Sequence, residues 1–131
     1  MTDQYDMNPT VMLPPNPDRR WTIAKQLGLD TAVVRFWGVD DWWEYDTLQR
    51  TVTRFADHGF SLDVVEDRPP MEKTVLGEAG RDAEIEVVKT LIENMGRLGI
   101  DIYCWVWTEN PLGVIRTSDS LPGRGDSQRI G

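Results

Sequence analysis

The chain has 131 residues and carries 22 acidic against 14 basic side chains, a formal net charge of −8. Such an acidic chain repels the phosphate backbone that supplies most nucleic-acid affinity, so neither nucleic acid nor an anionic membrane is an expected partner. Hydrophobic residues make up 40% of the sequence and include six tryptophans, enough to bury a core. The length suits one ordinary domain but is about half of the roughly 250 residues of an eight-stranded β/α barrel.

The sequence indicates a cytoplasmic protein. Cys104 is the single cysteine, so an intramolecular disulfide is impossible and nothing calls for an oxidising compartment. Residues 1–10 are acidic and polar, where a secretory signal needs positive charge followed by an apolar stretch. No run approaches the roughly 18 apolar residues of a membrane span.

The first predicted elements are a strand and a short helix. Residues 11–13 are apolar and are followed by two prolines, which end a strand, while residues 1–9 are expected to form a flexible tail. A helix is expected over about residues 18–27, directly after a proline. The side chains expected to face inward on this helix are Trp21, Ala24 and Leu27.

Two further strand-and-helix units follow. Residues 32–37 and 62–65 are rich in β-branched and aromatic residues, as strands covered on both faces are. The helix between them is predicted to start at Asp46 as N-cap, with Gln49 completing a capping box, and to bury Leu48, Val52 and Phe55. The third helix has apolar residues at helical spacing (Ile85, Val88, Leu91, Ile92, Met95 and Leu98), with Glu84, Glu86, Lys89 and Glu93 facing away.

A last strand is predicted over residues 102–107. Each of the three helices is followed by a glycine, the usual left-handed terminator (Gly28, Gly59 and Gly99). The order β-α-β-α-β-α-β indicates βαβ units in a parallel sheet, either an open doubly wound sheet or a closed barrel. Residues 108–131 are rich in Pro and Gly and are expected to form a long loop.

Ligands of parallel α/β folds bind at the carboxyl ends of the strands. Glu66 and Arg68 follow the third strand, Arg35 and Asp40 the second, and Glu109 the fourth. Arginine grips a carboxylate with two hydrogen bonds while acidic groups accept sugar hydroxyls, a combination that suits a polyhydroxy acid. The alternative is a surface ion pair between Glu66 and Arg68.

Other chemically interesting residues have structural interpretations. Acidic residues after the strands, Glu66, Asp67 and Glu109, are possible oxygen ligands for a hard cation. His58 is expected to cap the helix that ends at Gly59, and Cys104 to be an inert thiol buried within a strand. The tryptophans after the second strand (Trp37, Trp42 and Trp43) are expected to pack rather than to stack on a sugar.

Several segments together resemble the mannonate dehydratase family. They are residues 60–71, 80–86, 94–100 and 102–105, with the later Arg116–Thr117, and the resemblance extends over about residues 21–116. It implies a xylose-isomerase-like TIM (β/α)8 barrel of which residues 1–131 are the N-terminal half. After the fourth strand, residues 106–109 depart from the family pattern.

The resemblance also implies an activity. It implies removal of water from D-mannonate to give 2-keto-3-deoxy-D-gluconate with Mn²⁺ or Fe²⁺, whose ligands (two His, a Cys and an Asp) belong to later strands that this chain lacks. Glu66, Arg68 and Arg116 would bind the sugar-acid substrate, and a homo-oligomer is possible. The alternatives are a sugar isomerase or epimerase on the same barrel and a non-catalytic α/β interaction domain.

Overall fold

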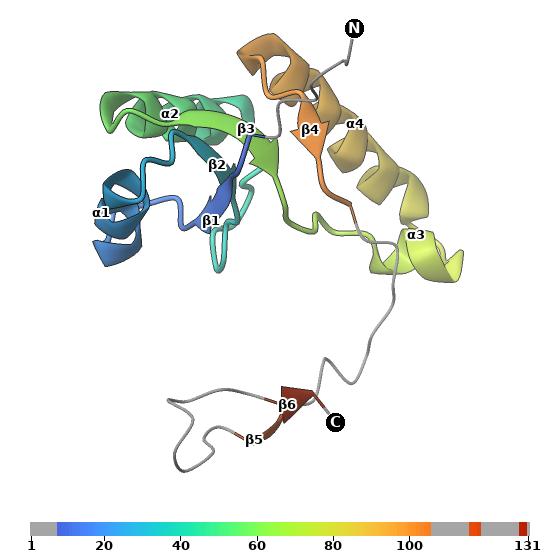
Figure 1. Cartoon of the computed structure of the whole chain (residues 1–131). Coiled ribbons are helices and arrows are strands. Elements are labelled where there is room, and N and C mark those ends of the chain that lie inside the picture. Colours follow the sequence, from blue (N-terminus) through green and yellow to red (C-terminus); the bar gives the residue numbers. More distant parts are fainter. Residues whose placement is uncertain (1–7, 106–115, 119–128, 131) are drawn as a thin grey trace, which may run out of the picture.

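The computed structural model describes residues 8–105, 116–118 and 129–130. Four strands form one parallel sheet in the order β1-β2-β3-β4, as Figure 1 shows. They are β1 (Val11–Leu13), β2 (Thr31–Val34), β3 (Ser61–Val65) and β4 (Ile102–Tyr103). Sheet order follows chain order with a helix in each connection, which confirms the predicted parallel β/α units; the sheet is not closed into a barrel.

Within the described residues, four helices accompany these strands. They are α1 (Arg19–Gln26), α2 (Tyr45–Asp57), α3 (Glu72–Leu76) and α4 (Arg81–Leu98). Of these, α3 was not predicted from the sequence. No helix among the described residues is both long enough and apolar enough to span a membrane.

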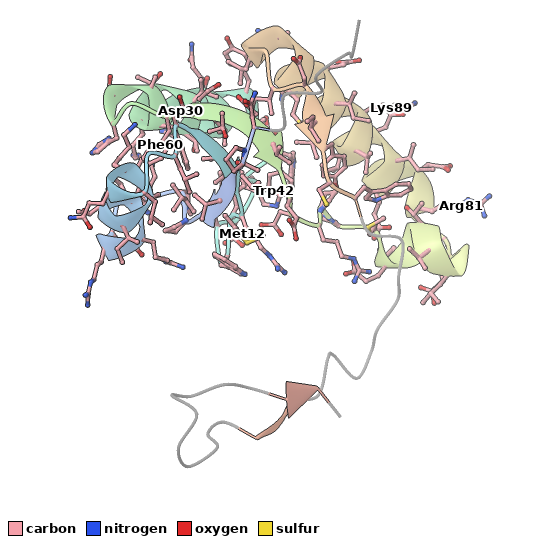
Figure 2. All side chains as sticks on the ribbon, in the orientation of Figure 1. Met12, Asp30, Trp42, Phe60, Arg81 and Lys89 are labelled. Atoms are coloured by element: carbon pink, nitrogen blue, oxygen red, sulfur yellow. The ribbon has the colours of Figure 1, made fainter. Side chains whose placement is uncertain are left out.

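One face of the sheet packs against the helices. Buried strand residues Leu13, Ala32, Val34, Leu62 and Val65 form one core with helix residues, among them Trp21, Leu48, Phe55 and Leu91. The rings of Trp21 and Phe55 lie 4.2 Å apart between their centroids. In Figure 2, Arg81 and Lys89 extend from α4 away from this core.

A bulge interrupts the pairing of β2 with β3. Ala32 is opposite Leu62, but Val33 is opposite Val64, so Asp63 is an extra residue in β3. The bulge explains why Leu62 and Val65, three positions apart, are both buried, since alternation alone would place them on opposite faces.

The predicted helix starts are half correct. The helix expected from about residue 18 begins at Arg19, and Asp18 is its N-cap, because its Oδ1 accepts a hydrogen bond from the backbone N–H of Arg20 at 2.8 Å. The prediction for α2 is wrong, since Glu44 is the N-cap and its side chain makes no capping bond. Asp46 instead lies inside the first turn, where its negative charge still complements the helix dipole.

The inward faces of the helices are also corrected in places. Trp21 and Ala24 are buried, but α1 ends before Leu27, which is 71% exposed. On α4, Leu91 and Met95 are buried while Ile85 and Ile92 are exposed.

Glu84, expected to face away, instead binds α3. Its Oε2 accepts hydrogen bonds from the backbone N–H and the hydroxyl of Thr74, at 2.7 and 2.9 Å. Desolvation raises the pKa of Glu84, but the hydrogen bonds from Thr74 and Lys73 together outweigh it, and the pKa is lowered.

The three glycines after the helices behave as predicted. Gly28, Gly59 and Gly99 have φ values of 78°, 76° and 71°, the left-handed region that a side chain disfavours. His58 is the C-cap of α2, and its Nδ1 lies 2.8 Å from the carbonyl oxygen of Arg54, which confirms its role at the helix end.

The last part of the chain differs from the prediction. β4 ends at Tyr103, and Cys104 is exposed rather than buried within the strand. Residues 106 and 107 of the predicted strand lie outside the described residues. Within the predicted loop 108–131, β5 (Arg116–Ser118) and β6 (Arg129–Ile130) pair antiparallel. The predicted tail falls almost wholly outside the described residues, which begin at residue 8.

Two leucine substitutions test this assignment of the core. Leu48 is fully buried, so Leu48→Ala should lower the free energy of unfolding by about 2–5 kcal/mol through lost burial and a new cavity. Leu27→Ala, the matched control, removes the same atoms from a side chain that is 71% exposed and should change stability by less than about 0.5 kcal/mol. Equal losses in urea titrations of the two variants would contradict the assignment.

Candidate functional site

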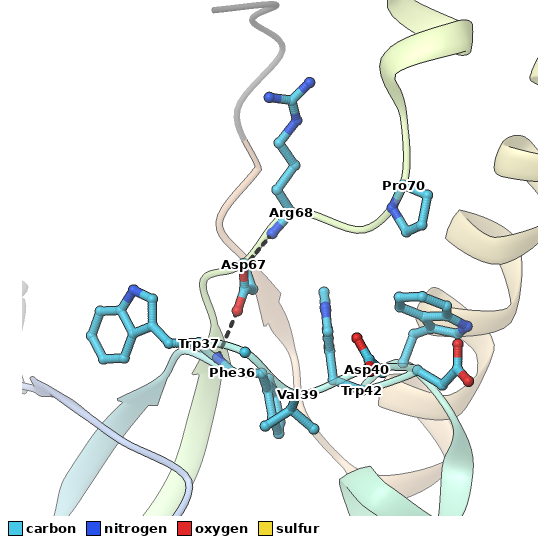
Figure 3. A pocket seen from close by; sticks show the side chains of 11 residues that line it. Phe36, Trp37, Val39, Asp40, Trp42, Asp67, Arg68 and Pro70 are labelled. Carbon is cyan, nitrogen blue, oxygen red and sulfur yellow. Dashed lines mark hydrogen bonds between the residues drawn. The ribbon is translucent and has the colours of Figure 1, made fainter. Parts of the chain in front are cut away.

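A cavity of about 650 Å³ opens where β2 and β3 end. Its wall is the loop that follows β2 together with residues directly after β3, so it lies at the carboxyl ends of the strands, where α/β folds bind ligands. Figure 3 shows the labelled side chains around it. The lining residues are Phe36, Trp37, Gly38, Val39, Asp40, Asp41, Trp42, Trp43, Asp67, Arg68 and Pro70.

Asp67 holds the two sides of the cavity together. Its Oδ2 accepts a hydrogen bond from the backbone N–H of Phe36 at 2.6 Å, and its Oδ1 accepts one from the backbone N–H of Arg68 at 2.8 Å (Figure 3). The first bond joins the exit of β2 to the exit of β3. Each oxygen of this carboxylate already accepts a hydrogen bond from a backbone N–H, which weighs against Asp67 as a metal ligand.

Tyr103 extends this connection to β4. Its hydroxyl donates a hydrogen bond to the carbonyl oxygen of Asp67 at 3.1 Å. Burial, followed by the charges of Asp67 and Cys104, raises the pKa of the Tyr103 phenol well above its ordinary value. The phenol therefore stays protonated and keeps its hydrogen bond at every physiological pH.

The predicted substrate residues occupy different places. Arg68 lines the cavity, and its Nη2 lies 3.8 Å from Glu72 Oε1; among the described residues, Glu72 rather than Glu66 is its ion-pair partner. Glu66 is half-buried and does not line the cavity. Its backbone N–H donates a hydrogen bond to the carbonyl oxygen of Val34, with 2.9 Å between N and O. Arg116 belongs to β5, and its side chain lies outside the described residues, as does the whole of Glu109.

The tryptophans divide between packing and exposure. Trp42 is buried and stacks on Phe36, with centroids 5.1 Å apart and planes 10° apart, and Trp43 packs against the core. Both agree with the predicted packing role. Trp37 is 51% exposed at the mouth of the cavity, and the guanidinium of Arg35 lies 5.3 Å from its ring centroid. Trp37 therefore offers an aromatic face to a ligand.

The described residues do not fit a transition-metal site. They contain no group of three His, Cys, Asp or Glu side chains placed to hold a metal ion. His58 packs edge-on against Trp21 at the far end of α2, and Cys104 is exposed after β4. Asp40 and Asp41 both line the cavity, but two carboxylates fall short of a set that binds Mn²⁺ or Fe²⁺ tightly.

A parallel β/α sheet with a cavity of polar and aromatic residues at its carboxyl edge defines an α/β protein with a candidate ligand site. The sequence profile of the family described as "D-mannonate dehydratase (UxuA)" matches residues 24–129, and the chain belongs to this family. This confirms the resemblance noted in the sequence.

Individual relatives agree. The chain is 36% identical over 67 residues to the mannonate dehydratase of Oceanobacillus iheyensis, a match that covers 51% of this chain and 19% of that protein. It is also similar to the crystal structure of mannonate dehydratase from Streptococcus suis serotype 2, with a TM-score of 0.65 and 25% identity, over 75% of this chain and 29% of that one. The chain thus spans less than a third of the length of these relatives.

The structural role of Asp67 can be tested by one substitution. Asp67→Asn replaces one acceptor with a donor, so one part-buried backbone N–H loses its partner and the free energy of unfolding should fall by about 1–3 kcal/mol. Asp40→Asn is the matched control, because Asp40 lines the same cavity but is exposed. Chemical denaturation of both variants measures the difference, and equal stabilities would remove Asp67 from this role.

Proposed function

We propose that the complete protein is a hydro-lyase that removes water from a sugar acid such as D-mannonate. The proton on the carbon beside the carboxylate and the hydroxyl on the next carbon leave together as water, and the resulting enol becomes 2-keto-3-deoxy-D-gluconate. The observation that carries the proposal is the family match over residues 24–129. The four parallel strands and the helices between them would then form part of a (β/α)8 barrel whose remaining units complete the site.

The chemistry of the cavity supports this proposal. Arg68 offers a planar cation, Asp40 and Asp41 offer hydroxyl acceptors, and Trp37 offers an exposed aromatic face. Sugar sites in proteins combine polar groups that fix hydroxyls with aromatic surfaces that cover the ring or chain. We assign Glu66, Arg68 and Arg116 to substrate binding; of the described side chains among these, that of Arg68 lines the cavity.

The proposed cofactor is Mn²⁺ or Fe²⁺, with its ligands outside the described residues. No step of the reaction is assigned to Glu66, Arg68 or Arg116 beyond binding and orienting the sugar acid. A homo-oligomer remains part of the proposal, and so does a cytoplasmic location.

The activity is tested on the complete protein as its gene encodes it. Incubated with D-mannonate and Mn²⁺ or Fe²⁺, it should form 2-keto-3-deoxy-D-gluconate, detected by NMR as a new C3 methylene and loss of the C2 proton, and chelation should abolish the reaction. Conversion of a ketose to an aldose without loss of water would identify an isomerase instead. Absence of any product from a panel of hexonates with metal present would reject the proposal.

Arg116 has a specific prediction. Arg116→Lys keeps the positive charge but loses the two parallel hydrogen bonds of a guanidinium, so sugar-acid binding should weaken by about 1–3 kcal/mol. The effect is measured as a rise in KM for D-mannonate in the complete protein. Arg19→Lys, on an exposed position of α1, is the control for a general effect of the exchange. Unchanged KM and kcat in the Arg116 variant would remove this residue from the site.

A further inference from the structure

Arg35 lies on the face of the sheet that the helices leave open. It follows β2 directly, between Val34 and Phe36, which are 0% and 2% exposed within the core. Side chains alternate between the two faces of an extended chain, so the half-buried Arg35 points to the face opposite the helices. This is the face that lines the interior when such a sheet closes into a barrel.

Glu66 is the neighbour of Arg35 on that face. Val34 pairs with Val65, and the backbone N–H of Glu66 donates to the carbonyl oxygen of Val34 at 2.9 Å, so Arg35 and Glu66 directly follow the last paired residues of β2 and β3. Val65 is fully buried on the helix side, which puts Glu66 on the open face. Neighbouring strands are about 4.8 Å apart, so the two side chains start from adjacent positions.

The two charges nevertheless do not pair. Within the part of the chain that the structure describes, Arg35 takes part in none of the ion pairs. Its Nε is buried and has no hydrogen-bond partner among the same residues. The guanidinium is held beside the ring of Trp37, with 5.3 Å between Cζ and the ring centroid.

A cation in this state is suited to an anionic ligand. A buried N–H without an acceptor is costly, and no acceptor among the described residues satisfies the Nε of Arg35. A guanidinium presents two parallel N–H groups that match the two oxygens of a carboxylate. The contact with Trp37 restrains the position of the guanidinium before a ligand binds, which reduces the entropy lost on binding.

We propose that Arg35 binds the carboxylate of the sugar acid on the open face of the sheet, with Glu66 beside it accepting a substrate hydroxyl. This inference rests on the proposed function and adds a residue to it. Arg35 is then the group that selects an acid over a neutral sugar or polyol, while Arg68, which is already paired with Glu72, contacts the substrate from the loop above.

The test compares two ligands that differ in their charge. Binding of D-mannonate and of D-mannitol, its polyol counterpart without the carboxylate, is measured by calorimetry on the complete protein, both with Mn²⁺ and with EDTA. Arg35→Gln should weaken D-mannonate binding by roughly tenfold to a hundredfold and leave D-mannitol binding unchanged. Arg35→Lys should bind D-mannonate more weakly than the unaltered protein and more tightly than Arg35→Gln. Arg19→Gln, which removes an exposed charge on α1, should bind both ligands as the unaltered protein does.

Each outcome decides the proposal. D-mannonate binding that is equal in the unaltered protein and in both Arg35 variants would overturn it, as would equal losses for the two ligands, which a merely structural arginine produces. If Arg35→Gln fails to fold, the Lys variant carries the same comparison. D-mannonate that binds through Arg35 without being dehydrated would refute the proposed reaction alone, and failure of the unaltered protein to bind D-mannonate would refute both.

Discussion

The candidate site depends on the hydrogen bonds that Asp67 makes. The carboxylate accepts hydrogen bonds from the backbone N–H groups of Phe36 and Arg68, and the carbonyl oxygen of Asp67 accepts one from the hydroxyl of Tyr103. One residue is therefore bonded to the ends of β2, β3 and β4. Parallel strands end with unpaired backbone groups, and a loop that leaves them needs other partners. Asp67 supplies such partners beside the cavity. One of its hydrogen bonds holds the backbone N–H of Arg68, directly after β3.

Much of the fold was predictable because it depends on patterns within short segments. The apolar runs of β2 and β3 and the spacing of Leu91 and Met95 on α4 report burial directly, without knowledge of any neighbour. The left-handed conformation of Gly99 likewise needs only its own chain. The order of strands and helices, and hence the edge of the sheet that carries the site, follows from these local signals.

The errors concern where elements end and which distant segments are in contact. Leu27 was expected to be buried because it continues the spacing of Trp21 and Ala24, but α1 ends one residue before it and nothing covers it among the described residues. Cys104 was expected inside a strand that ends at Tyr103. The bond from Asp67 to Phe36 joins residues 31 positions apart, and the one signal for it in the sequence is a short acidic side chain directly after a strand.

The extra residue in β3 determines which chemistry faces which side of the sheet. If Asp63 paired with Val33 instead of forming the bulge, with the pairing of Leu62 with Ala32 retained, Glu66 would stand opposite Phe36 and point into the helix layer, while Val65 would replace it beside Arg35. Loss of the bulge, with no change in sequence, would thus exchange an apolar and a charged side chain between the core and the open face of the sheet. The bulge in β3 therefore keeps Glu66 beside Arg35 and Val65 in the core, which the simple alternation of the strand would not do.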